Sequence, residues 1–433
     1  MLDKKLYDEI TEKVFNIPIF DTHEHILDEE DRKKHKLDFS SFFSIYSATD
    51  LQISGMSQED FLLFQNEDTE VNKKWELFSP HWENVKNTNY AKVLFEVLKG
   101  LYGFTDITVS NYIELSKKIE DTKKEKWYDY VINKKSNVCK VLNHLDNVKE
   151  ASIRFADRKD FRHVLNLDDM VMTCCPDDIA EVEKRFDTVI YSLKDFLSVI
   201  DIIFENSVKN SYIGLKIALA YIRDIQFDET SFAEAEKAFI KLFKLKNYGY
   251  IKDRKDFLSK SELKPFQDYI VHYLVRKAFE RDVPVQIHIG ILEGLYNDVS
   301  NSRPAYLINL LIKYKKCRFD IFHAGYPYSD ELMAICKQFP NAYFNLCWVS
   351  AISSQLYRNI LERLIEIIPS NKILGFGGDY VFVEGMYGAQ QLARKTISET
   401  LHNKVQEGYF TLEQAIGFAE KILYSNPSYL YKW

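Results

Sequence analysis

Residues 318–346, RFDIFHAGYPYSDELMAICKQFPNAYFNL, hold a short apolar strand, a helical segment and a second apolar strand in succession. We predict the strands at 318–323 and 342–346 and the helix at 330–338. Two strands separated by a helix lie parallel in one sheet, because the helix carries the chain back across the sheet in a right-handed crossover. This stretch therefore predicts an α/β fold with a parallel sheet.

The same alternation of strands and helices extends to both sides of this stretch. Further strands are predicted at 17–22, 138–142, 212–217, 283–288 and 372–376, and the ambiguous region 151–172 has room for another. Helices are predicted at 190–204, 231–245, 261–280, 305–314 and 355–367, with two more beginning at Gly388 and Leu412. About eight strand–helix units favour a closed (β/α)8 TIM barrel over an open sheet.

The region 28–137 departs from this alternation. It is rich in Lys, Glu and aromatic residues with helical spacing, and it contains no convincing strand. We interpret it as a helical insertion after the first strand. The chain 1–433 is then expected to form a single barrel domain, because barrels commonly run long as one domain.

Composition excludes several classes of protein. The 46% hydrophobic and 28% charged residues are typical of a globular chain and exclude a mainly disordered one. A formal net charge of -7 argues against a nucleic-acid binder, which would carry a basic stripe. The longest apolar runs are shorter than the roughly 18–20 residues of a membrane span. Aromatic residues make up 14%, which is compatible with a homo-oligomer.

The cysteines and the N-terminus point to a reducing compartment. None of the six cysteines forms a CxxC pair, and Cys174 and Cys175 are adjacent, so we expect reduced thiols and no disulfide framework. The first residues, MLDKKLYDEITEKVF, are charged throughout and lack the apolar core of a signal peptide. We therefore expect a cytoplasmic protein.

Polar side chains follow four of the predicted strands at their carboxyl ends. They are His23 and His25, His288, His323 and Asp379. In a TIM barrel this end carries the active site. Each residue has an ordinary alternative, since a histidine at a strand end is often a hydrogen-bonded core residue and Asp379 could cap a helix. Their common placement on one rim favours a functional site.

The pair His23-Glu24-His25 is the sharpest local signal. Residues two apart in an extended chain point to the same face, so both imidazoles could hold one metal ion with Glu24 turned away. The alternative is two polar residues in a loop. His81 and His144 are kept as additional candidates, because the insertion could lean over the site.

The order of the segments FDTHEHI, VQIHIG, DIFHAGYP and GFGGDY resembles the amidohydrolase superfamily. The long helical insertion, the residues AYFNLCW at 342–348 and the residues SNPSYLY at 425–431 are similar to its uronate-isomerase and amidohydrolase 2 branches. One departure is clear: this chain has Gly-Asp-Tyr-Val at 378–381, where uronate isomerases typically have Thr-Asp-Ser-Arg. The missing arginine puts sugar-acid isomerisation in doubt.

The resemblance implies a role for each of these side chains. His23, His25, His288 and Asp379 would ligate a divalent metal, with Asp379 also acting as base. His323 would be a second-metal ligand or would polarise the substrate. Lys216 falls where some members carry a carboxylated bridging lysine, although a plain lysine that holds a substrate carboxylate fits as well.

Three nitrogens and one carboxylate suit Zn²⁺, with Mn²⁺ or Fe²⁺ as alternatives. The first hypothesis is therefore a metal-dependent hydrolase that cleaves a C–N or C–O bond of a small, anionic molecule, with Lys216 and Arg223 binding the anion. Arg223 could equally be a solvated loop charge. Two further hypotheses remain open: isomerase or decarboxylase chemistry at the same metal, and a non-catalytic binding protein with a relic site.

Overall fold

The computed structural model describes residues 3–124, 126–145, 155, 158–209, 212–245 and 258–433. Eight parallel strands pair in sequence order, each with the next along the chain. The TIM-barrel prediction is confirmed, including the strand left uncertain within 151–172. The strands are β1 (Ile19–Glu24), β2 (Val138–Leu145), β3 (Phe161–Asn166), β4 (Tyr212–Ile217), β5 (Val285–Ile287), β6 (Phe319–Ile321), β7 (Ala342–Asn345) and β8 (Ile373–Leu374).

Backbone hydrogen bonds between β1 and the segment after β8 close the barrel. The Thr22 N–H donates to Phe376 O at 3.2 Å, and the His25 N–H donates to Tyr380 O at 2.9 Å. In the opposite direction, the Asp379 N–H donates to His23 O at 2.9 Å. The polar residues at the carboxyl ends of the first and last strands therefore lie next to each other.

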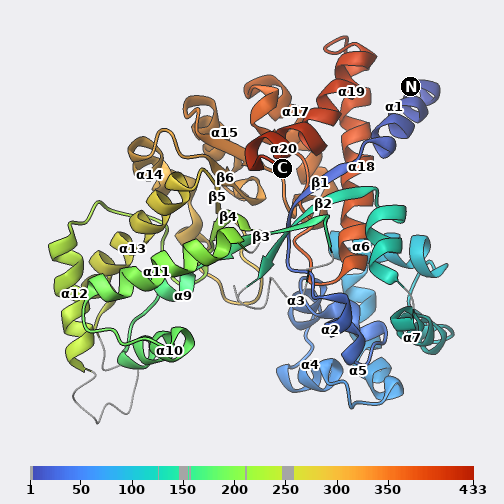
Figure 1. Ribbon diagram of the computed structural model, residues 1–433. Helices are drawn as coiled ribbons and strands as arrows, with labels where there is room; N and C mark the ends of the chain where they lie inside the picture. Colours follow the sequence, from blue (N-terminus) through green and yellow to red (C-terminus); the bar gives the residue numbers. More distant parts are fainter. Residues whose placement is uncertain (1–2, 125, 146–154, 156–157, 210–211, 246–257) are drawn as a thin grey trace.

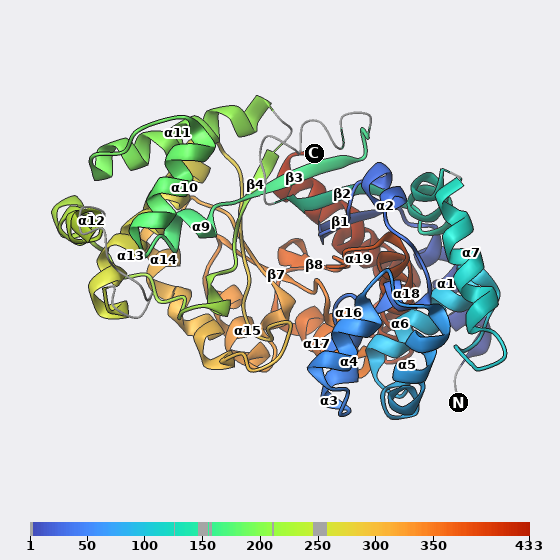
Figure 2. The ribbon, with the colours of Figure 1, turned by 90° about the horizontal axis from the view of Figure 1, so that it is seen from below.

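Helices surround the strands, and most begin and end close to the predicted positions. Figures 1 and 2 show α9–α14, green to yellow, on the side of the molecule opposite α18. The principal helices are α9 (Asp168–Val171), α10 (Pro176–Phe186), α11 (Leu193–Lys209), α12 (Phe232–Leu245), α13 (Lys260–Glu280), α14 (Ile308–Lys313), α15 (Ser329–Gln338), α16 (Val349–Ile352), α17 (Ser354–Ile367), α18 (Val383–Gln406), α19 (Leu412–Glu420) and α20 (Asn426–Tyr431), with α1 (Lys4–Asn16) before the first strand.

The start of α18 differs from the prediction, which placed it at Gly388. The helix already begins at Val383, and Gly385 and Gly388 lie inside it at close-packing positions. A Cβ at Gly388 would lie 2.4 Å from Val93 O of α6 (Asn89–Val97), and one at Gly385 would lie 2.1 Å from the Tyr380 ring. The two glycines let α18 pack tightly against the insertion and the β8 exit.

The described residues between β1 and β2 form helices and loops without a strand. Figures 1 and 2 show these helices, blue to teal, gathered on one side of the molecule next to α18. Their core is aromatic: the Phe43 and Phe78 rings, for example, lie 4.9 Å apart. Besides α6, the helices are α2 (Glu29–Lys34), α3 (Ser47–Ile53), α4 (Gln58–Gln65), α5 (Val71–Val85) and α7 (Tyr112–Asp121), with a further helical turn η4 (Asp129–Lys135).

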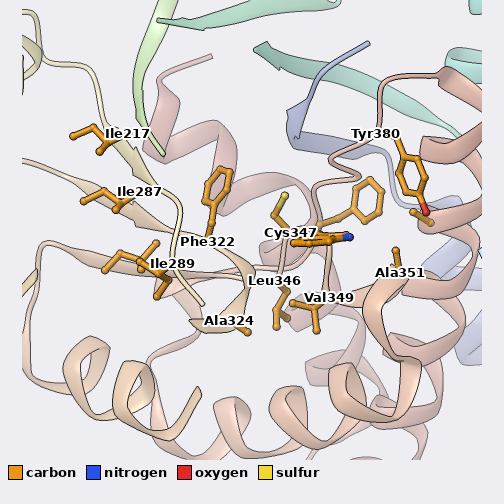
Figure 3. Close-up of a cluster of buried hydrophobic side chains, with 14 of the residues drawn as sticks. Ile217, Ile287, Ile289, Phe322, Ala324, Leu346, Cys347, Val349, Ala351 and Tyr380 are labelled. Atoms are coloured by element: carbon orange, nitrogen blue, oxygen red, sulfur yellow. The ribbon is translucent and has the colours of Figure 1, made fainter. Parts of the chain in front are cut away.

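Apolar side chains pack on the face of β4 and β5 opposite Lys216 and Gln286, the preceding residues of these strands. Ile217 and Ile287 are register partners on β4 and β5, and Figure 3 shows them close together beside Ile289. Phe322 follows β6 and is fully buried. The six cysteines are free thiols. No described helix combines the length and the apolar character that a membrane crossing needs.

Candidate metal centre

His23, His25 and Asp379 form a compact triangle at the closure of the barrel. The Nε2 atoms of His23 and His25 lie 3.2 Å apart. Asp379 Oδ1 lies 3.6 Å from His23 Nε2 and 3.3 Å from His25 Nε2. A tetrahedral ion with ligand distances of about 2.0–2.2 Å would separate its ligand atoms by about 3.3–3.6 Å. The three atoms therefore have the spacing of three corners around one Zn²⁺-sized ion.

His288 and His323 form a second pair on the other side of Asp379. His288 Nδ1 lies 3.0 Å from His323 Nε2, and His323 Nε2 lies 3.9 Å from Asp379 Oδ2. Asp379 Oδ1 thus faces His23 and His25, and Oδ2 faces His323. Sequence reasoning grouped His288 with His23 and His25, whereas the structure pairs it with His323.

Hydrogen bonding to the outer nitrogens fixes the tautomers of His288 and His323. His288 Nε2 lies 2.9 Å from Ile291 O, and His323 Nδ1 lies 3.1 Å from Cys347 O. A carbonyl oxygen only accepts, so each of these nitrogens carries the hydrogen. The neutral rings then turn two bare lone pairs, on Nδ1 of His288 and Nε2 of His323, toward each other at 3.0 Å.

The outer nitrogen of His23 is fixed in the same way. His23 Nδ1 lies 3.0 Å from Gln286 Oε1, and the Gln286 Nε2 donates to Thr22 O at 3.0 Å. Because Thr22 O only accepts, the amide oxygen of Gln286 faces His23 and takes the Nδ1 hydrogen. The Nε2 of His23 keeps its lone pair for the cluster. Three inward lone pairs beside a carboxylate fit a cation.

Burial keeps His23, His288 and His323 neutral, and the basic groups around Asp379 keep its carboxylate ionised. Burial lowers the pKa of His23 and of His288 well below the ordinary value, and it lowers the pKa of His323 to about 4. For Asp379, burial opposes ionisation, but the hydrogen bond from His25 and the nearby basic groups outweigh it and hold its pKa below the usual range. These are the protonation states that a metal requires of its ligands.

The backbone is strained at the same positions. His323, Trp348 and Asp379 have φ values of 58°, 67° and 62°, in the left-handed region that non-glycine residues rarely adopt. Such residues cost roughly 1–3 kcal/mol each and cluster at functional sites. Three of them at neighbouring strand exits support a functional role for this rim.

Lys216 belongs to the cluster, and Arg223 is engaged elsewhere. Lys216, at the end of β4, is 2% exposed, and its Nζ lies 3.8 Å from the Phe322 ring centroid. Burial lowers the pKa of Lys216, against the attraction of Asp379. Arg223 donates to Gln267 Oε1 at 3.0 Å and to Asp268 Oδ1 at 2.7 Å, both on α13. These hydrogen bonds direct its guanidinium toward α13 and not toward the histidine cluster.

His144 is a site neighbour that sequence reasoning only kept in reserve. Its ligand nitrogen lies within 4.8 Å of those of His23 and His25. The sequence did not indicate this role, because the strand was predicted to end at residue 142. In the structure β2 runs to Leu145, and His144 therefore lies near the strand exit. The other reserve candidate, His81, lies in α5 and pairs its Nδ1 with Ser54 Oγ at 3.0 Å.

Two further residues near the site, Tyr46 and Cys347, were not predicted from the sequence. Tyr46, in the insertion before α3, donates its hydroxyl to Asp379 O at 2.5 Å. Its ring stacks on Trp348 with centroids 4.5 Å apart. The Cys347 Sγ lies within 4.8 Å of ligand atoms of His323 and Asp379, but burial raises its pKa well above the ordinary value and keeps it a thiol.

Comparison with solved structures shows the same fold over almost the entire chain. A uronate isomerase from Thermotoga maritima matches with a TM-score of 0.78 and 14% identity, covering 99% of this chain and 98% of that one. A glucuronate isomerase from Caulobacter crescentus gives 0.79 and 15%, covering 99% and 94%. A proposed metal-dependent hydrolase from Lactobacillus casei gives 0.67 and 15%, covering 98% and 97%.

Sequence comparison reaches a smaller part of the chain. Protein fluG of Emericella nidulans is 30% identical over 179 residues, which are 40% of this chain and 20% of that protein's length. The family model described as Amidohydrolase matches residues 226–433, which include His288, His323 and Asp379. Residues 226–433 thus resemble the amidohydrolase family, and the chain, an eight-stranded parallel barrel, shares its fold with these solved structures.

Proposed function

We propose that this chain is a metal-dependent hydrolase that cleaves a C–N or C–O bond of a small, anionic molecule. The observation that carries the proposal is the convergence of the lone pairs of His23, His288 and His323 beside the ionised Asp379 carboxylate, because neutral nitrogens around a carboxylate suit a cation. Held at this cluster, a divalent metal would act as a Lewis acid and lower the pKa of water from about 15.7 toward about 7.

His23, His25 and Asp379 would hold this ion. Their spacing supports Zn²⁺, and Mn²⁺ or Fe²⁺ are the alternatives for a set of nitrogens and a carboxylate. The tautomer of His323 favours a ligand role over donation to a substrate carbonyl, because its inward Nε2 carries a lone pair. His288 and His323 therefore extend the proposed ligand set toward the second oxygen of Asp379.

Asp379 is the proposed general base. Its carboxylate stays ionised although it is buried, so it can accept a proton from the attacking water and pass it to the leaving group. Lys216 is the proposed anion-binding group, because it is buried and its positive charge lowers the pKa of both Asp379 and His23. Within the described contacts, Arg223 is already committed to Asp268 and supports this role less well.

Isomerisation of a uronate is the second candidate. The likeness in fold to two uronate isomerases extends over 99% of this chain and so includes the insertion. The segment after β8 argues against it, because Tyr380 and Val381 follow Asp379 where an arginine would be expected from the resemblance.

Turnover of a substrate panel separates the two candidates. The panel consists of lactones, N-acyl amino acids, uronates and hydroxybenzoates, assayed with Zn²⁺, Mn²⁺ and Fe²⁺. We expect hydrolysis of a lactone or an N-acyl amino acid by the wild type and none by Asp379→Asn. His81→Ala, which removes a histidine of α5 outside the cluster, should retain activity. Turnover of a uronate alone would overturn the hydrolase proposal in favour of isomerisation.

A further inference from the structure

A buried chain of hydrogen bonds connects His23 to α20, at the other end of the barrel. His23 Nδ1 lies 3.0 Å from Gln286 Oε1, and the Gln286 Nε2 donates to the Tyr431 hydroxyl at 2.7 Å. Tyr431 in turn donates to Asp320 Oδ2 at 2.5 Å. His23, Gln286 and Asp320 are fully buried and Tyr431 is 3% exposed, so water does not compete for these bonds.

The donor and the acceptor of each hydrogen bond in this series can be assigned. Asp320 Oδ1 already accepts from Asn345 Nδ2 at 2.8 Å, and ionised Asp320, the form present above its raised pKa of about 7, accepts the Tyr431 hydrogen with Oδ2. The oxygen of Tyr431 can then only accept from Gln286. Gln286 Nε2 therefore has two acceptors, Tyr431 and Thr22 O, and its Oε1 must turn toward His23.

Packing fixes the position of Tyr431 in this series of hydrogen bonds. Asn426, at the start of α20, donates to Ile373 O at 2.7 Å, which ties the helix to the beginning of β8. The Tyr431 ring lies 5.8 Å from that of Phe20 on β1. These contacts belong to a separate apolar cluster that also holds Leu142, Val164, Tyr343, Leu374 and Leu430. The hydroxyl that orients Gln286 is thus supplied by a rigid element.

We propose that Gln286 and Tyr431 are positioning residues for the metal ligand His23. This inference rests on the proposed metal site. Gln286 holds the hydrogen of His23 on Nδ1, which keeps the Nε2 lone pair aimed at the cluster. Tyr431 holds the Gln286 amide in the orientation that this requires. Groups that orient a metal-bound histidine in this way typically change metal affinity by about 10–100-fold when removed.

Three variants test the inference. Gln286→Met removes both polar ends and keeps the side-chain length, and Tyr431→Phe removes only the hydroxyl. Tyr343→Phe is the control, because Tyr343 is a buried tyrosine of the same apolar cluster that has no recorded bond to Gln286. The measurements are the Zn²⁺ dissociation constant, from competition with a chromophoric chelator, and the His23 ring ¹⁵N shifts of the metal-free protein.

We expect Gln286→Met to weaken Zn²⁺ binding by about 10–100-fold and to shift the His23 ring from Nδ1–H toward a mixture of tautomers. Tyr431→Phe should weaken binding by about 2–10-fold, the range for one lost neutral hydrogen bond, and Tyr343→Phe should bind as the wild type does. If Gln286→Met does not fold, Tyr431→Phe and its tautomer shift decide the question.

The results separate this inference from the proposed function. Wild-type affinity together with the wild-type tautomer in both folded variants would overturn the positioning role and leave the metal site standing. An equal loss in Tyr343→Phe would also overturn it, because the effect would then be one of packing. A wild-type protein that binds none of the three metals would overturn both proposals.

Discussion

His25 Nε2 lies 3.3 Å from Asp379 Oδ1, although the two residues come from opposite ends of the chain. The backbone brings them together, because the His25 N–H donates to Tyr380 O and the Asp379 N–H donates to His23 O, both at 2.9 Å. The bonds that close the barrel are therefore the bonds that assemble the candidate metal centre. Changes that disturb the closure should disturb metal binding as well as stability.

Gly378→Ala should destabilise the protein. A Cβ at Gly378 would lie 2.0 Å from Oε1 of Glu24, a fully buried side chain that accepts from the Tyr380 N–H at 2.7 Å. Overpacking of this kind costs about 1–3 kcal/mol. Gly417→Ala is the matched control, because nothing lies within 4 Å of a Cβ in this α19 position. It should stabilise by about 0.5–1 kcal/mol, and urea unfolding would measure both. Equal stability of the two variants would contradict the assigned crowding.

Tyr46→Phe should affect both the insertion and the site. The lost hydroxyl leaves Asp379 O without its 2.5 Å donor, and one neutral hydrogen bond is worth about 0.5–1.5 kcal/mol. Because Asp379 holds a left-handed φ, we expect weaker Zn²⁺ binding in addition to the loss of stability. Tyr314→Phe removes a hydroxyl that donates to His272 O at 3.0 Å, and it should lose stability alone. Indistinguishable Zn²⁺ affinities would show that Tyr46 supports the fold only.

Lys216→Met tests the anion-binding role. With a substrate found in the panel, we expect kcat/KM to fall by about 10–100-fold through KM, because a hydrogen bond to a charged group is worth about 1.5–3 kcal/mol. The Zn²⁺ content should stay at the wild-type level. Loss of bound metal in this variant would instead support a carboxylated lysine that bridges two ions, and would contradict the substrate role.

His163 should make stability depend on pH. Burial lowers its pKa from 6.5 to about 4, so below pH 6.5 the unfolded chain binds a proton that the folded protein refuses. Its stabilising contribution is therefore complete above about pH 6.5 and is lost as the pH falls toward 4. At about 1.36 kcal/mol per unit, the loss is on the order of 3 kcal/mol. Urea unfolding of the metal-free protein from pH 7.5 to 4 should show a flatter profile for His163→Phe; parallel profiles would contradict this account.

The sequence predicted the barrel because its later strands are apolar and separated by helices of regular length. The prediction was least accurate where one sequence pattern is compatible with two structures. Gly385 and Gly388 resemble a helix boundary, yet they serve close contacts of α18. The strand β3 lies in a region where short polar and apolar stretches alternate without a clear start, and its pairing with β2 and β4 decides its position.

Within the candidate site, the spacing of His23 and His25 predicted their shared face, and the strand exits predicted that His323 and Asp379 would meet. The lone pair that His288 turns toward His323 follows from the hydrogen bond to Ile291 O, which only the folded loop provides. Gln286, Tyr46 and Tyr431 are ordinary strand, loop and helix residues in the sequence. Their roles follow from contacts between distant segments, and a single sequence does not contain these contacts.

Metal content and coordination test the central claim most directly. The account predicts that protein reconstituted with Zn²⁺ and freed of excess holds the ion in the wild type and in the control His81→Ala, and loses it in His25→Ala. X-ray absorption should show only nitrogen and oxygen ligands, at about 2.0–2.2 Å. A wild type that retains no divalent metal, or a His25→Ala variant that binds Zn²⁺ with unchanged affinity, would contradict it.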